Sequence, residues 1–131
     1  MHFARRHLPV LAACTLFLIG SAGCSSPPEA SNPLDIALAS GIPTLAEFGR
    51  GTCIPCQTMK VILDELAVTY KDRVNIVIIS VDDYPDLTRQ YGVGAIPTQI
   101  IFDSSGKKVR LHLGVWPIEY MVEQFNKLGV E

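Results

Sequence analysis

Residues 75–81 limit the possible folds of this chain more than any other segment. They read NIVIISV, an almost continuous run of apolar and mostly β-branched residues. A run of this kind is typical of a parallel strand that is covered on both faces. We therefore expect an α/β protein in which helices lie on both faces of a sheet.

Helical and strand-like patterns alternate on either side of this run. Apolar residues recur at spacings of three and four in the helical segments, and Pro or Gly marks several of their ends. The predicted helices span residues 34–39, 53–70, 85–91 and 117–128. The predicted strands span residues 44–48, 75–81, 98–102 and 108–113. The last two strands flank the turn 103–106 and predict a hairpin, so the whole order predicts one mixed central sheet.

Composition excludes several classes of protein. The chain has 131 residues, of which 48% are apolar and 18% charged, which suits one folded domain and excludes wholesale disorder. The 11 basic and 13 acidic residues are interspersed and form no basic block. We therefore expect no nucleic-acid partner, and we expect a monomer.

The first residues have the features of an export signal. Arg5 and Arg6 precede an apolar run over residues 8–19, which is shorter than the roughly 20 residues of a membrane-spanning helix. Residues 21–24 read SAGC and resemble a bacterial lipoprotein signal, in which Cys24 would be lipidated and become the N-terminus. The small residues Ser21 and Gly23 also suit ordinary secretion, and an uncleaved anchor is a third possibility. All three place the domain outside the cytoplasm, facing the periplasm or the cell exterior.

Three parts of the chain follow from this interpretation. Residues 1–23 form a cleaved signal peptide. Residues 24–33 form a Ser- and Pro-rich tether, whose last nine residues, SSPPEASNP, span at most roughly 30 Å. Residues 34–131 form the folded domain, held at the membrane by a lipid on Cys24.

The predicted chemistry lies in the sequence Cys53-Ile54-Pro55-Cys56, at the start of the long helix. A helix N-terminus carries partial positive charge and unpaired N–H groups, which stabilise a thiolate. Cys53 is expected to be the exposed, attacking thiol, and Cys56 the thiol that resolves the mixed disulfide. Pro55 is tolerated because its missing N–H would be unpaired in the first turn.

Other roles of a cysteine pair are less consistent with this chain. A purely structural disulfide closing so short a loop contributes only about 2 kcal/mol. Covalent haem attachment needs a His after the second cysteine, where the chain has Gln57. A zinc site usually needs four ligands, and lipidation of Cys24 would leave only three Cys or His side chains in the mature chain, so we expect no zinc site. A Cu(I) ion on two thiolates is chemically possible and stays open. The Cys and His residues of the mature chain are Cys24, Cys53, Cys56 and His112.

Three segments together resemble the thioredoxin family. The first is CIPC between a strand and a helix, followed by ILDEL at residues 62–66; the second is the strand around residues 76–82; the third is YGVGAIPT at residues 91–98. Gly114 matches a further glycine of the family. The resemblance covers residues 44–128 and implies a thioredoxin-like fold.

The resemblance also implies roles for individual residues. Cys53 is then the nucleophile, Cys56 the resolving thiol, and Glu47 a buried acid that accepts the proton of Cys56. Pro97 is implied to be a cis-proline. The residues implied to form the substrate groove are Ile54, Pro55, Ile96, Pro97 and Thr98. The redox-active disulfide takes the place of a cofactor.

The chain departs from the family at several positions. Thr52 stands where the family has Trp, and Gly49 lies where an aromatic is usual. The family's lysine near the buried acid falls at Ile78, so Glu47 is expected to lack that partner. Arg50 is expected to be a solvated loop residue. Trp116 is expected to pack in the core or on the surface.

The predicted function is a thiol–disulfide oxidoreductase of thioredoxin type. Pro55 before the second cysteine and Ile96 before Pro97 resemble reducing members of the family, which favours a protein-disulfide reductase. The expected substrates are oxidised cysteines of exported proteins, and the expected electron donor is a transmembrane thiol-reducing protein. A disulfide oxidase or isomerase, and a non-catalytic Cu(I) or thiol carrier, are the alternatives.

Overall fold

The computed structural model describes residues 31–131, so the predicted signal peptide and Cys24 lie outside the described residues. Eight elements follow one another in the order predicted, with ends that differ from the expected ones by at most one residue. They are α1 (Pro33–Ala39), β1 (Thr44–Gly49), α2 (Ile54–Thr69), β2 (Asn75–Ser80), α3 (Pro85–Gln90), β3 (Thr98–Phe102), β4 (Lys108–Leu113) and α4 (Ile118–Lys127). None of the helices in residues 31–131 is long and apolar enough to cross a membrane.

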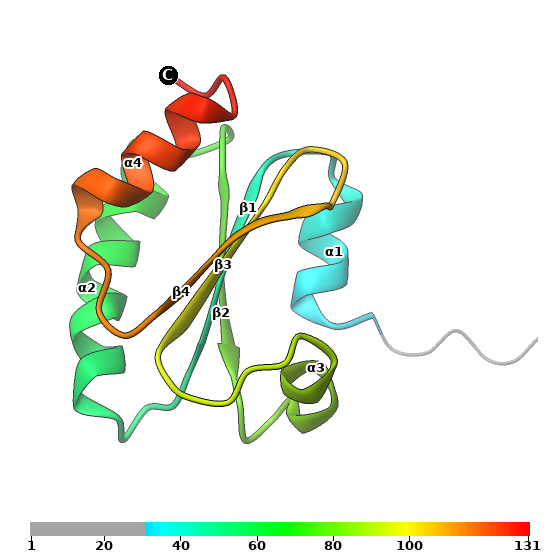
Figure 1. Cartoon of the computed structure of the whole chain (residues 1–131). Helices are drawn as coiled ribbons and strands as arrows, with labels where there is room; N and C mark the ends of the chain where they lie inside the picture. The colour runs from blue at the N-terminus through cyan, green and yellow to red at the C-terminus, as the bar shows by residue number, and fades with distance from the viewer. Residues whose placement is uncertain (1–30) are drawn as a thin grey trace, which may run out of the picture.

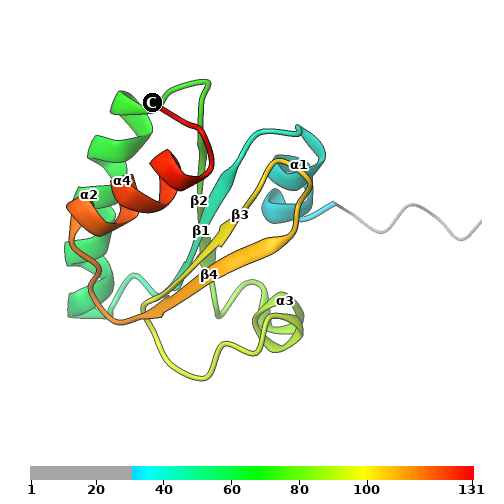
Figure 2. The same cartoon turned by 45° about the horizontal axis from the view of Figure 1, so that its top comes forward.

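The strands form one mixed sheet in the order β2-β1-β3-β4. β1 runs parallel to β2 and antiparallel to β3, and β3 pairs antiparallel with β4 as the predicted hairpin. Figures 1 and 2 show α2 and α4 on one face of this sheet and α1 and α3 on the other. The predicted α/β fold, with a mixed sheet between helices, is confirmed.

The expectation that the run at residues 75–81 is covered on both faces holds only in part. Among the described strands, β2 lies at an edge of the sheet, with β1 on one side only. Its side chains do contact the apolar clusters on both faces, through Ile76 on one and Val77 and Ile79 on the other. Most of them are nevertheless only partly buried, and Ile78 is 46% exposed. An apolar run thus indicated contact with both faces, but not a central position in the sheet.

The core consists of two clusters, one on each face of the sheet. Leu45 of β1 and Ile101 of β3 pack with α2 and α4, and Trp116 is buried in the same cluster. Phe48 of β1 and Ile100 of β3 pack on the opposite face, beneath α1 and α3. Side chains alternate between the faces along each strand, so Glu47 lies on the face of Leu45, beneath α2.

Candidate active site

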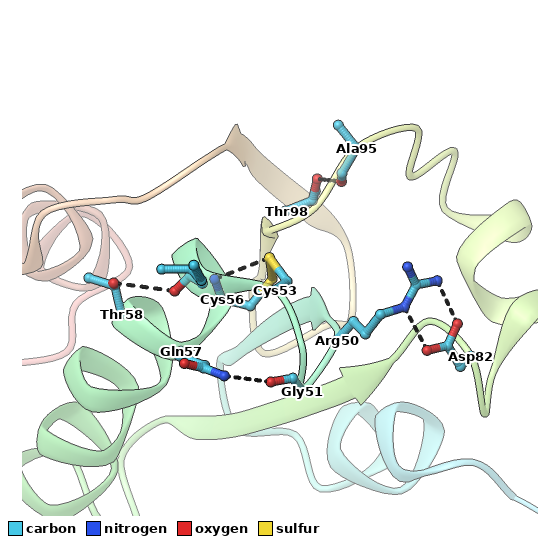
Figure 3. The surroundings of a disulfide bond; sticks show 10 residues. Arg50, Gly51, Cys53, Cys56, Gln57, Thr58, Asp82, Ala95 and Thr98 are labelled. Carbon is cyan, nitrogen blue, oxygen red and sulfur yellow. Dashed lines mark hydrogen bonds and ion pairs between the residues drawn. A yellow bond between two sulfur atoms is a disulfide. The ribbon is translucent and has the colours of Figure 1, made fainter.

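The two cysteines of the CIPC sequence are joined in a disulfide at the N-terminus of α2. Cys53 is the N-cap of the helix, and its Sγ accepts a hydrogen bond of 3.3 Å from the backbone N–H of Cys56 (Figure 3). Cys53 is partly exposed, whereas Cys56 is only 5% exposed. An incoming disulfide therefore meets Cys53 first. In the reduced protein, the free N–H groups and the helix dipole stabilise the Cys53 thiolate.

Polar contacts hold the loop that connects β1 to these cysteines. The backbone N–H of Cys53 donates to the carbonyl of Arg50 at 3.1 Å, and the side-chain amide of Gln57 donates to the carbonyl of Gly51 at 2.7 Å. The Arg50 guanidinium donates two hydrogen bonds of 2.6 Å to Asp82 (Figure 3). Arg50 was expected to be a solvated loop residue; it is half-exposed, but its charge is paired with Asp82. These hydrogen bonds hold the pKa of Asp82 below its usual range.

The segment before β3 contains the residues predicted to form the substrate groove. The peptide bond between Ile96 and Pro97 is cis, and Pro97 accepts a hydrogen bond of 2.8 Å from the N–H of Gly114. Ile96 is partly exposed, but Thr98 is fully buried, and its hydroxyl donates to the carbonyl of Ala95 at 2.6 Å (Figure 3). The structure thus places Thr98 as a support for this turn and not on its surface.

On the α2 side, the predicted groove residues are open to solvent. Ile54 is 75% exposed at the first position of α2, and Pro55 is exposed beside it. An exposed apolar side chain directly after Cys53 can pack against a substrate. The structure therefore leaves this end of the helix accessible.

Glu47 is a buried carboxyl on β1, and not a surface residue. It is 1% exposed, and burial raises its pKa from the ordinary value of 4.5 to about 7, against an opposing effect of the positive charge on Lys60. Burial favours the neutral acid because the charged form loses its hydration. A carboxyl group with a pKa near 7 can both accept and release a proton at neutral pH.

Gly49 allows Glu47 and Cys56 to approach each other. A Cβ atom at this position would lie 3.3 Å from both Cys56 Sγ and Glu47 Oε1. The sulfur and the carboxyl oxygen are therefore separated by at most twice that distance. A cavity of about 260 Å³ adjoins them and has room for several water molecules. Its lining residues are Glu47, Gly49, Arg50, Gly51, Cys56, Gln57, Lys60, Ile78 and Ser80.

Lys60 provides a positive charge near Glu47 that the sequence interpretation did not assign. Glu47 was expected to have no lysine partner, because Ile78 occupies the family's position. That expectation was incomplete, since Lys60 lines the same cavity and its positive charge lowers the pKa of Glu47. Its ammonium group also binds Asp64, at 2.7 and 2.8 Å. The available signal was helical spacing, since Lys60 lies one turn after Cys56 on α2.

The sequence interpretation also missed Gln99. This residue of β3 is fully buried, and its register partner on β1 is Glu47. The signal was a single amide in the otherwise apolar strand TQIIF, apart from the Thr at its start. Within residues 31–131, three or more His, Cys, Asp or Glu side chains nowhere gather closely enough to hold a metal ion.

A cysteine pair at a helix N-terminus, beside a cis-proline turn and a buried acid, defines a dithiol–disulfide oxidoreductase built on an α/β sheet. A sequence model described as thioredoxin matches residues 32–126. The chain therefore belongs to the thioredoxin family.

Several known thioredoxins are similar to this chain. The M-type chloroplastic thioredoxin of Chlamydomonas reinhardtii is 32% identical over 71% of this chain and 66% of that protein. Thioredoxin 1 of Synechococcus elongatus is 34% identical over 69% of this chain and 83% of its own length. A crystal structure of chloroplastic thioredoxin z superimposes with a TM-score of 0.67 and 28% identity, covering 73% of this chain and 87% of the other.

Membership in this family assigns the reaction. The protein is a thiol–disulfide oxidoreductase that acts on protein disulfides through the Cys53–Cys56 pair. The two sulfur atoms carry the exchanged electrons themselves, so the redox disulfide takes the place of a cofactor.

Proposed function

We propose that the protein reduces disulfides in exported proteins, outside the cytoplasm, while a lipid on Cys24 holds it at the membrane. The observation that carries the exchange reaction is the site itself: a partly exposed Cys53, a buried Cys56, and a carboxyl group of suitable pKa near the buried sulfur. Pro55 before Cys56 and Ile96 before Pro97 support reduction as its direction. The export signal, the SAGC sequence and the following tether support the location.

The proposed reaction transfers two electrons from the dithiol to the substrate. The Cys53 thiolate attacks one sulfur of the substrate disulfide, forming a mixed disulfide and releasing the first substrate thiolate. Glu47, as the carboxylate, takes the proton of the Cys56 thiol. The Cys56 thiolate then attacks Cys53 Sγ, so that the Cys53–Cys56 disulfide forms and the second substrate thiolate leaves.

The substrate reaches the site between the N-terminus of α2 and the cis-proline turn. Ile54 and Pro55 offer exposed apolar contacts on one side, and the partly exposed Ile96 on the other. An extended substrate segment can pair with the backbone of this partly exposed residue. The enzyme then needs a reductant, and a transmembrane thiol-reducing protein is the proposed donor.

Reduction of a model protein disulfide, such as that of insulin, tests the reaction. The mature domain, pre-reduced with dithiothreitol and freed of it, should reduce insulin with one disulfide formed per disulfide reduced. Its reduction potential should lie near about −270 mV, the value of thioredoxins, whereas a value near about −120 mV would instead make it a disulfide donor. If no reversible couple appears, the oxidoreductase proposal fails, and the Cu(I) carrier becomes the hypothesis to test.

Mass spectrometry of the membrane fraction tests the location. Expression of the full chain in a bacterial host should yield a protein that begins at Cys24 and carries acyl chains. A matched Cys24→Ser variant should lose the lipid and either stay uncleaved or be released. A wild-type protein that begins elsewhere, or that carries no lipid, would contradict the anchor but leave the reductase reaction intact.

A further inference from the structure

Three buried side-chain atoms in the described part of the chain have no hydrogen-bond partner. They are Oε1 of Glu47 and both Oε1 and Nε2 of Gln99. Glu47 is 1% exposed and Gln99 is fully buried. Unpartnered buried polar groups are uncommon in native proteins, and each requires an explanation. Here all three atoms belong to two residues.

These two residues lie directly opposite each other in the sheet. β1 and β3 are antiparallel, and Glu47 is the register partner of Gln99. Two residues along the strands, Leu45 faces Ile101, and both pack in the cluster beneath α2 and α4. Because side chains alternate along a strand, Glu47 and Gln99 point to the same face as that pair. Opposite residues have Cβ atoms about 4.5–5.5 Å apart, within reach of two long side chains.

We propose that Gln99 is a positioning residue whose amide binds the Glu47 carboxyl group in both of its protonation states. This inference rests on the proposed role of Glu47 as the proton acceptor of Cys56. An amide suits both states because it carries a donor and an acceptor. Nε2 donates to the carboxylate before the proton transfer. After the Cys56 proton has moved to Glu47, the new O–H group donates to Oε1 of Gln99.

The groups around Glu47 leave this role to Gln99. From α2, Lys60 faces Glu47, but its ammonium group binds Asp64. From the loop after β1, Arg50 reaches the same cavity but is paired with Asp82. β2 contributes Ile78 as the register partner of Glu47 and Ser80 as a further residue of the cavity lining.

Gln99 itself has few other partners within reach. The cavity beside Cys56 is lined by Glu47 but not by Gln99, so the amide does not border this cavity. On the other side, the register partner of Gln99 on β4 is His112. The ring of His112 is stacked on Trp116, and its Nε2 lies 3.3 Å from the carbonyl of Val115. The Glu47 carboxyl group therefore remains the partner that matches the amide.

A carboxyl titration in the oxidised mature protein tests the proposal. The Cys pair does not titrate in this form, so the ¹³C shift of the Glu47 carboxyl reports its own protonation. Gln99→Met keeps the length of the side chain and removes the amide. A hydrogen bond to a charged acceptor is stronger than one to a neutral acceptor, so its loss should raise the Glu47 pKa by about one. An unchanged pKa would overturn the proposal. Gln90→Met, the same change at an exposed site on α3, is the matched control.

A double-mutant cycle separates positioning from simple packing. In the wild-type background, Gln99→Met should destabilise the protein relative to its effect in a Glu47→Leu background, where no carboxyl is left to bind. Equal effects in the two backgrounds would show that Gln99 acts alone and would refute the pairing. The proposed function is tested separately by the pH profile of insulin reduction by Glu47→Gln. An unchanged profile there removes Glu47 from the reaction, while the titration still reads the Gln99–Glu47 contact.

Discussion

The raised pKa of Glu47 predicts that the folded protein loses stability as the pH rises from about 4.5 to about 7. In the unfolded chain Glu47 ionises near 4.5, whereas in the folded protein it ionises near about 7. Between these values the folded state holds a proton that the unfolded state has released, so stability falls with increasing pH. The difference between the two pKa values corresponds to about 3 kcal/mol in the free energy of unfolding. None of this stability is lost below pH 4.5, and all of it is lost above pH 7.

Glu47→Gln isolates this contribution, because the amide keeps the size of the side chain and does not titrate. Urea unfolding of both oxidised proteins, from pH 4 to pH 8.5, should show the difference between them changing by about 3 kcal/mol in favour of the variant. All other titrating groups are shared and cancel in this difference. A difference that stays constant across the range would refute the reasoning, because Glu47 would then ionise alike in the folded and unfolded states.

The remaining predictions concern the neighbours of Glu47. Lys60→Met should raise the Glu47 pKa modestly in the ¹³C titration, because Lys60 is largely exposed and solvent screens its charge; high salt should abolish the difference. Gly49→Ala should destabilise the oxidised protein by about 1 kcal/mol, since its methyl group would contact the fixed Cys56 sulfur, and urea unfolding with dithiothreitol should show a smaller loss. Cys56→Ser should trap substrates as mixed disulfides on Cys53 in non-reducing gels; a variant that traps none would contradict the order of attack.

The sequence predicted the elements and the cysteine chemistry because both depend on local signals. Helical spacing and turn residues located α2 and α4, and the position of Cys53 before a helix indicated its exposure. The position of β2 in the sheet could not be predicted in the same way. A continuous apolar run records contacts on the two faces of a strand, and says nothing about which strands lie beside it.

The electrostatics of the site were only partly predictable, because they arise between elements that are distant in the sequence. The burial of Glu47 followed from the family resemblance, but the charge that moderates it comes from Lys60 on the next helix. Gln99 became noticeable only when the register of β1 and β3 placed it opposite Glu47. Pairings of this kind depend on how two strands that are distant in the sequence align, which the pattern of either strand by itself does not give.

The redox-active disulfide of this protein closes a very short loop of the chain. Cys53 and Cys56 are three residues apart, and their Cα atoms are separated by 5.2 Å at the start of one helix. The two core clusters and the strand pairings involve other residues, and Cys56, although buried, belongs to neither cluster. Opening this bond therefore releases no long loop, and its formation closes none. The protein can therefore cycle between its dithiol and disulfide forms while its sheet and its two core clusters keep the same contacts.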